Sequence, residues 1–193
     1  MSDLDLPISV ALGVGLAAAT GFRIFLPMLI MSIAAYTGHL PIDARFAWLA
    51  TPSALAMLAV ATLAEILAYY IPAVDNLLDT LAAPASMVAG IVASAAVMTD
   101  VPPIVKWTAA VIAGGGIAGL TQGMTTIVRA KSTILTGGVG NPVISTVELG
   151  GALLVSILAL AAPLAALAVV ILFLWIAMRF VRQLFRRESR PDN

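Results

Sequence analysis

Three ionisable side chains stand inside long apolar stretches of this 193-residue sequence: Arg23, Glu65 and Glu148. A charge at the centre of a bilayer costs about 2.5–3.5 kcal/mol on insertion scales, so it must face protein, water or an opposite charge. Arginine stays protonated, whereas a buried carboxyl can exchange a proton. These residue types predict either ion and proton handling within a membrane or an Arg–acid pair that sets helix packing. The sequence leaves both interpretations open.

Pro27 follows Arg23 by four residues, in the segment Gly21-Phe-Arg-Ile-Phe-Leu-Pro27. A proline inside a helix leaves the carbonyl four residues earlier without its usual donor. We therefore predict a broken helix whose kink presents Arg23 to an anionic group or to a carboxylate. Three further polar residues are candidates for a substrate or ion path: Thr20, Thr121 and Gln122.

The composition predicts the surroundings in which these side chains act. The chain is 61% hydrophobic and 10% charged, whereas soluble domains are nearer half apolar and a quarter charged. Apolar stretches of about 18 or more residues recur, which is typical of transmembrane helices. The predicted fold is therefore an all-α, polytopic membrane helix bundle, with the lipid bilayer as its partner.

Several chemistries are disfavoured by residues that the sequence lacks. It has no cysteine and one histidine, His39, so it offers no thiolate, no histidine cluster for a metal and no Ser-His-Asp arrangement. We expect a protein that is not an enzyme, without a metal or another cofactor and without a nucleic-acid partner. A small ion or solute is the expected substrate, and glycine-lined helix faces would permit a homo-oligomer.

Six membrane spans are predicted, and prolines open four of them. Together they form one membrane domain, 1–193, with halves at 1–100 and 101–184 and a basic polar tail at 185–193. Between the second and third spans, Asp75 and Asp79 belong to a predicted interfacial helix over 73–81. The spans cover 8–36, 46–71, 84–98, 103–128, 142–160 and 163–180.

The basic residues predict an orientation. With six spans, one side of the membrane carries seven of them, in the connection after the fourth span and in the tail: Arg129, Lys131, Arg179, Arg182, Arg186, Arg187 and Arg190. The other side carries only Arg45 and Lys106. The excess of basic residues predicts a bacterial inner-membrane protein with both termini in the cytoplasm. The acidic N-terminus lacks the basic start of a signal peptide, so the first apolar run is expected to be retained.

Two segments of the sequence resemble each other. Gly13-Val-Gly-Leu-Ala-Ala-Ala-Thr20 and Gly114-Gly-Gly-Ile-Ala-Gly-Leu-Thr121 share four of eight residues. A three-span unit repeated in tandem enters the membrane from opposite sides, so this similarity favours an inverted 3+3 repeat. Glu65 and Glu148 are predicted at similar depth in the cytoplasmic half, which conflicts with their being equivalent positions of such a repeat.

Several irregularly spaced motifs are spread over the chain: Gly21-Phe-Arg23 with Pro27, Glu65, Ile71-Pro-Ala-Val-Asp-Asn76, Pro84, Arg129-Ala-Lys-Ser-Thr133, Gly140-Asn-Pro-Val143 and Glu148. Together they resemble a bacterial membrane-protein family catalogued as domain of unknown function 4126. The resemblance covers nearly the whole chain and implies a multi-pass membrane protein without an established activity. Tyr69 departs from it, because an acid is expected there, and this puts an acidic cluster at that position in doubt.

The sequence is consistent with two functions. In the first, the protein is a small transporter or channel-like conduit. Arg23 binds an anionic substrate group or locks a gate, and Glu65 and Glu148 couple protons or cations. In the second, it is a membrane scaffold whose buried charges are structural and whose tail or Asp75 helix meets a soluble partner.

Overall fold

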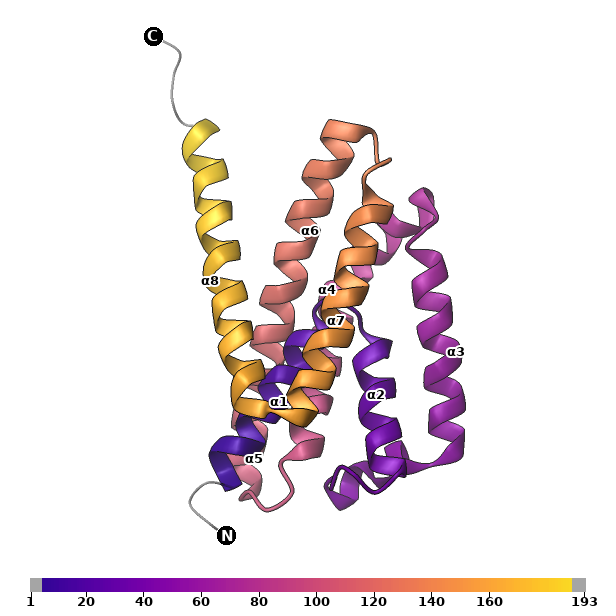
Figure 1. Cartoon of the computed structure of the whole chain (residues 1–193), viewed down its shortest axis with the longest axis vertical. Coiled ribbons are helices and arrows are strands. Elements are labelled where there is room, and N and C mark those ends of the chain that lie inside the picture. The colour runs from indigo at the N-terminus through magenta and orange to yellow at the C-terminus, as the bar shows by residue number, and fades with distance from the viewer. Residues whose placement is uncertain (1–4, 189–193) are drawn as a thin grey trace.

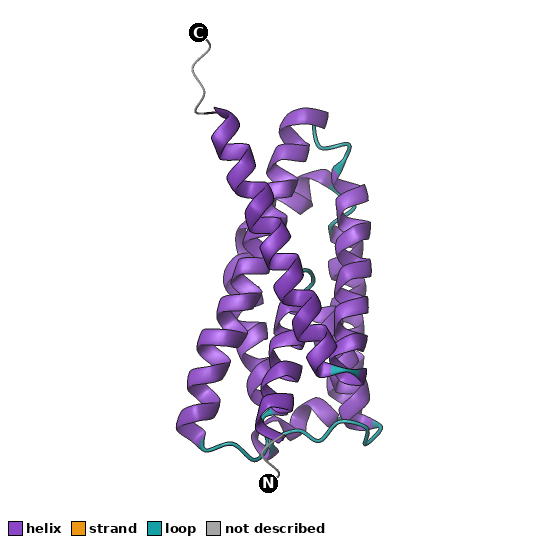
Figure 2. Cartoon of the chain, turned by 60° about the vertical axis from the view of Figure 1, so that its left-hand side comes forward, coloured by secondary structure: helices purple, strands orange, loops and turns teal. Residues whose placement is uncertain are grey.

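The computed structural model of this protein describes residues 5–188, with side chains for residues 6–71, 74, 78 and 80–179. The described chain is helical and contains no strand, which confirms the all-α prediction (Figure 2). The predicted roles of Asp75, Asp79 and the basic tail from Arg182 onwards fall outside the described side chains. The helices are α1 (Asp5–Thr20), α2 (Phe25–Tyr36), α3 (Pro52–Ala68), α4 (Pro72–Val97), α5 (Pro103–Ala109), α6 (Gly116–Thr136), α7 (Asn141–Ala161) and α8 (Pro163–Glu188), with a 3-10 segment η1 (Ala44–Ala50) and a π-helical segment η2 (Ala110–Gly115).

The first predicted span is a hairpin that turns back inside the bundle. In Figure 1, α1 rises from the lower end to the middle of the molecule and α2 returns to the lower end. Contacts at the two ends agree with this path. The Thr20 hydroxyl, at the end of α1, lies 3.4 Å from the Ser86 carbonyl in mid-α4. The amide of Asp43, after α2, donates to the Ala96 carbonyl at the end of α4 at 2.8 Å. We call α1, α2 and the turn at residues 21–24 the re-entrant hairpin.

Pro27 has a different role from the predicted one, in which it breaks the helix and its kink presents Arg23. Helix α2 begins at Phe25, which places Pro27 in its first turn. An N–H in the first turn has no partner within its own helix, so a proline costs little there. The break lies before the proline, at residues 21–24, and Pro27 helps to start the second helix.

The hairpin changes the count of spans and the position of the chain ends. Among the described residues, three stretches are long and apolar enough to cross a bilayer, and η1 with α3 would be a fourth, bent by 67°. Six spans are therefore not confirmed. Helix α1 begins at the lower end of Figure 1 and α8 ends at the upper end, whereas six spans would bring both ends of the chain to one side. The three stretches are Thr80–Val97, Pro103–Thr136 and Asn141–Ala161.

The two similar segments run side by side in the same direction. A side chain at Gly13 or at Gly114 would collide with Ser94 of α4. Further up, Gly21 lies against Thr121, at the end of the second segment. Both segments rise from the lower end, so the predicted inverted repeat is not confirmed. Their shared small residues instead allow α1, α4 and the η2–α6 segment to approach closely.

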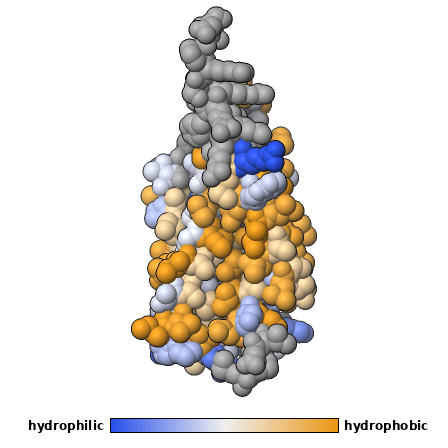
Figure 3. Space-filling model, turned by 90° about the vertical axis from the view of Figure 1, so that its left-hand side faces the viewer, coloured by the Kyte–Doolittle hydropathy of each residue, from blue (hydrophilic) through white to orange (hydrophobic). Residues whose placement is uncertain are grey.

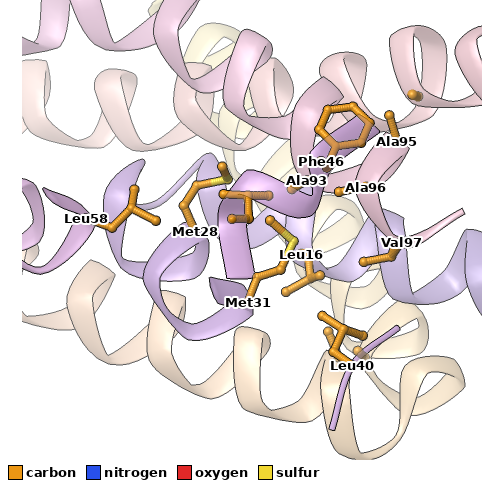
Figure 4. Close-up of a cluster of buried hydrophobic side chains, with 14 residues drawn as sticks. Leu16, Met28, Met31, Leu40, Phe46, Leu58, Ala93, Ala95, Ala96 and Val97 are labelled. Atoms are coloured by element: carbon orange, nitrogen blue, oxygen red, sulfur yellow. The ribbon is translucent and has the colours of Figure 1, made fainter. Parts of the chain in front are cut away.

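An apolar cluster at the lower half of the bundle holds the hairpin against its neighbours. Leu16 of α1, Met31 of α2 and Leu49 of η1 are completely buried, and Figure 4 shows Leu16 and Met31 close together among the side chains of this cluster. On the face shown in Figure 3, hydrophobic side chains cover the middle and hydrophilic ones gather towards the two ends. This distribution suits a bundle whose outer surface meets lipid.

One ion pair lies at the lower end. Lys106, which is 3% exposed, contacts through its ammonium group the carboxylate of Asp43, just before η1. The same carboxylate accepts a hydrogen bond from the Arg45 amide at 3.0 Å. The pair therefore joins the connection after the hairpin to the start of the α5–α6 helix.

Candidate functional site

The buried charges predicted from the sequence meet at the tip of the re-entrant hairpin. Arg23 occupies the turn between α1 and α2 and is 2% exposed. Glu65 reaches the tip from α3, and Glu148 reaches it from α7. The two glutamates thus approach the same turn of the chain from different helices. Glu148 lies within the first half of α7, the half that begins near the upper end of the bundle (Figure 1).

Arg23 binds α7 through one of its terminal nitrogens. Nη2 donates to the carbonyl of Ser145 at 2.9 Å and lies 3.7 Å from Oε2 of Glu148. The two other guanidinium nitrogens, Nε and Nη1, have no hydrogen-bond partner among the described residues. Buried donors normally have partners, so the guanidinium retains capacity to bind a further acceptor.

Arg129 is the strongest partner of Glu148, a pairing that was not predicted from the sequence. Its Nε donates to Oε1 of Glu148 at 3.0 Å, and its Nη2 contacts Oε2, which makes a two-point Arg–carboxylate pair. The predicted position of Arg129, in the connection after the fourth span, is wrong: it lies within α6 and is 2% exposed. The signal was present: Thr121, Thr125 and Arg129 are spaced by four residues and share one face of an apolar helix.

Tyr69 places an aromatic ring beside both arginines. The guanidinium carbon of Arg23 lies 3.9 Å from the ring centre, and that of Arg129 lies 4.3 Å from it. A cation over an aromatic face is attracted by about 0.5–2 kcal/mol. The ring thus stabilises two like charges that both lie within ion-pair distance of the Glu148 carboxylate. We call Arg23, Tyr69, Arg129 and Glu148 the charged centre.

Glu65 binds the backbone of the hairpin instead of an arginine. Its Oε1 accepts from the Ile24 amide at 2.8 Å, and its Oε2 accepts from the Phe25 amide at 3.0 Å. These amides are at the start of α2, where helix N–H groups lack partners and a partial positive charge develops. The carboxylate caps a helix that begins inside the bundle, where water would otherwise be needed.

A glycine lets the tip approach α6. A side-chain carbon at Gly21 would lie 2.5 Å from the Ala118 carbonyl and 2.5 Å from Cβ of Thr121. The next residue, Phe22, packs its ring on Phe173 of α8 with centroids 5.0 Å apart. The order Gly-Phe-Arg therefore gives the tip a backbone contact with α6, an aromatic contact with α8 and a charge directed towards α7.

Two pockets flank the hairpin tip, and each contains a glutamate. The Glu65 pocket, with a volume of about 440 Å³, lies between the start of α2, α3 and α4 and includes Tyr69. The Glu148 pocket, of about 180 Å³, lies between α6, α7 and α8 and includes Phe22. The remaining lining residues are apolar apart from Thr125. The tip therefore separates two largely apolar pockets.

The other predicted path residues contribute to helix contacts. The Thr20 hydroxyl donates to the Ala17 carbonyl at 2.7 Å. The Thr121 hydroxyl is buried without a hydrogen-bond partner among the described residues, and Gln122 Nε2 lies 3.4 Å from the Thr126 hydroxyl. Thr20 ends the helix that leads into the turn of Arg23, and Thr121 contacts that turn at Gly21.

The chain belongs to the family described as domain of unknown function (DUF4126), whose model matches residues 10–183. This span includes the whole hairpin tip, the charged centre and Glu65. The resemblance seen in the sequence is thereby confirmed. No curated protein and no solved structure matches the chain.

Proposed function

We propose that this DUF4126 protein is a multi-pass membrane protein that conducts or transports a small ion or solute, with the re-entrant hairpin as its moving gate. The observation that carries the proposal is that polar contacts of two carboxylates hold the hairpin tip from two sides, Glu65 from α3 and Glu148 from α7. Discontinuous helices with ends inside the membrane are characteristic of transporter binding sites.

The proposed movement follows from the contacts that hold the tip. Protonation of Glu65 would remove the charge that stabilises the start of α2. Binding of an acceptor to the free N–H groups of Arg23 would compete with its contacts to Ser145 and Glu148. Either event would loosen the wall between the two pockets. Glu65 and Glu148 are thus proposed as proton or cation couplers, and Arg23 as the lock.

The orientation proposed for a bacterial inner membrane follows the basic residues. Lys131 belongs to the second half of α6 and Arg179 to the second half of α8, and both helices end at the upper end of Figure 1. The excess of basic residues then places the upper end in the cytoplasm. The start of α1 would then face the opposite side of the membrane. Of the two chain ends, we therefore propose that only the C-terminal end faces the cytoplasm.

Flux in proteoliposomes tests this function. Purified protein is reconstituted, and proton and ion movement is followed for the wild type, Arg23→Ala, Glu65→Gln and Glu148→Gln. The proposal expects flux in the wild type and an altered pH dependence in the glutamate variants. A control is Asp100→Asn, which changes an exposed carboxyl. The absence of flux across a broad solute panel, from protein that remains folded, would instead support a scaffold with structural charges.

A further inference from the structure

An apolar groove runs along the gap between α3 and α4, below the charged centre. The Glu65 pocket continues into a second pocket of about 550 Å³, since both are lined by Ile24, Phe25 and Ala85. Helix α3 packs mainly on α2 and η1 and has little contact with α4. The lining of the two pockets extends along α3 from Met57 to Ala68, and so over most of the length of that helix.

Among the described residues that line the groove, Glu65 alone carries a carboxyl group. Each of its oxygens accepts one backbone N–H, whereas a carboxylate offers about four acceptor positions. No cationic side chain among the described residues forms an ion pair with it. Glu148 differs in this respect, because Arg129 and Arg23 both lie within ion-pair distance of its carboxylate.

The shape and charge of the groove select one class of ligand. Ligand pockets commonly measure about 300–1,000 Å³ and combine apolar walls with a few polar groups. Alanines and aromatic rings line this groove, including the partly exposed Phe25, and an aromatic face also attracts a cation. An anion would meet the Glu65 carboxylate first and be repelled. A hydrated inorganic cation would lose its water without gaining enough oxygen ligands.

The geometry points to a binding site for a lipophilic organic cation, whose apolar body lies in the α3–α4 groove and whose charge lies beside Glu65. The inference rests on the proposed function, because it names the substrate class that such a conduit would carry. It also makes a claim about binding that can be measured without transport.

Two ions of matched shape test the site. Tetraphenylphosphonium and tetraphenylborate carry the same four aromatic rings with opposite charge. Their binding to the purified full-length protein in neutral detergent is measured by equilibrium dialysis at neutral pH. We expect the phosphonium to bind saturably and the borate to bind at least about tenfold more weakly, as suits one charge-complementary contact. Equal binding of the two ions would overturn the inference.

Three variants locate the site. Glu65→Gln should reduce phosphonium binding by about tenfold or more. Because this change also weakens the cap of α2, Ala85→Phe provides a second test: it leaves Glu65 intact but fills the groove where the two pockets join. Ala56→Phe is the matched control, since Ala56 is exposed on α3 and lines neither pocket. Phosphonium binding that survives both Glu65→Gln and Ala85→Phe in folded protein would overturn the site.

Binding and flux results separate the inference from the proposed function. Phosphonium binding at the groove without any flux would support this site and contradict the conduit. Flux of other solutes without phosphonium binding would overturn the site and leave the conduit supported. Tighter binding of the borate, lost in Arg23→Ala, would overturn a cation site in favour of an anion site at the charged centre.

Discussion

The guanidinium group of Arg23 lies over the ring of Tyr69, with its central carbon 3.9 Å from the ring centre. Arg129 approaches the same ring at 4.3 Å. Two positive charges thus lie beside the same ring, and both are within ion-pair distance of the Glu148 carboxylate. The resemblance to the family predicts a carboxyl at the position of Tyr69. In this chain the π-electrons of the ring supply the negative potential instead.

The aromatic ring of Tyr69 should therefore stabilise the folded protein. We expect Tyr69→Phe to retain both cation–π contacts, and Tyr69→Leu to lower the free energy of unfolding by about 1–3 kcal/mol more, because two cations lose an aromatic face. Thermal unfolding of the purified variants in detergent measures the difference. Equal stability of the Phe and Leu variants would show that the ring only fills space.

Glu148 should be coupled to Arg129. Glu148→Gln leaves two buried arginines without their carboxylate, and breaking such a buried pair costs about 3–5 kcal/mol. The double variant Glu148→Gln/Arg129→Gln should be less destabilised than the sum of the two single variants. A double-mutant cycle of unfolding free energies measures this coupling. Additive effects would contradict a direct, energetically important pair.

Gly21 should tolerate no larger side chain. Gly21→Ala would press a methyl group against the Ala118 carbonyl and Thr121, and overpacking of this kind costs about 1–3 kcal/mol. Gly123→Ala in α6 is the control, because its added carbon meets no atom within 4 Å. It should be neutral or stabilising by up to about 1 kcal/mol, as a helical Gly→Ala change is. If melting temperatures fall equally for both, tight packing of the tip is not the cause.

The hairpin can be distinguished from a continuous span by labelling. The chain has no cysteine, so single cysteines introduced at Leu6, His39 and Val139 report which side of the membrane each position faces. All three positions are exposed. A membrane-impermeant thiol reagent applied to one side of the membrane should label Leu6→Cys and His39→Cys together, and Val139→Cys only from the other side. Labelling of positions 6 and 39 from opposite sides would show that the first segment spans the membrane.

The Asp43–Lys106 pair should add stability that disappears in acid. The Asp43 carboxylate accepts a hydrogen bond from Lys106 and another from the Arg45 amide, and these bonds lower the pKa of Asp43 below its usual range. The unfolded chain therefore binds this proton before the folded chain does. The stabilisation is present above the usual aspartate value of about 4 and is lost as pH falls through the lower folded pKa.

Unfolding of the wild type and of Asp43→Asn, followed as a function of pH, measures this contribution. The two proteins should differ at neutral pH, begin to converge below about pH 4 and become alike once pH falls below the folded pKa of Asp43. Asp100→Asn, which changes an exposed carboxyl, is the control and should behave as the wild type does. Persistence of the Asp43 difference in strong acid would contradict the ion pair.

The composition alone determined the class of fold. Long apolar stretches cannot all be buried in a chain of 193 residues. Helices suited to a bilayer follow from that hydrophobicity and from the need to satisfy backbone groups within each helix. The same reasoning identified Arg23, Glu65 and Glu148, because a charge in an apolar stretch requires a partner. It also predicted similar depth for the two glutamates, since depth follows from counting residues along a helix.

The tertiary structure decided the direction of α2 and the partners of each charge. One long span and a hairpin of two shorter helices have the same hydrophobicity. The choice depends on Glu65, far along the chain, which caps a helix start inside the bundle. Counting residues along a helix likewise gives no information on how the helix is rotated about its axis. That rotation pairs Arg129 with Glu148, brings Tyr69 beside two arginines and leaves the Glu65 carboxylate facing an apolar groove.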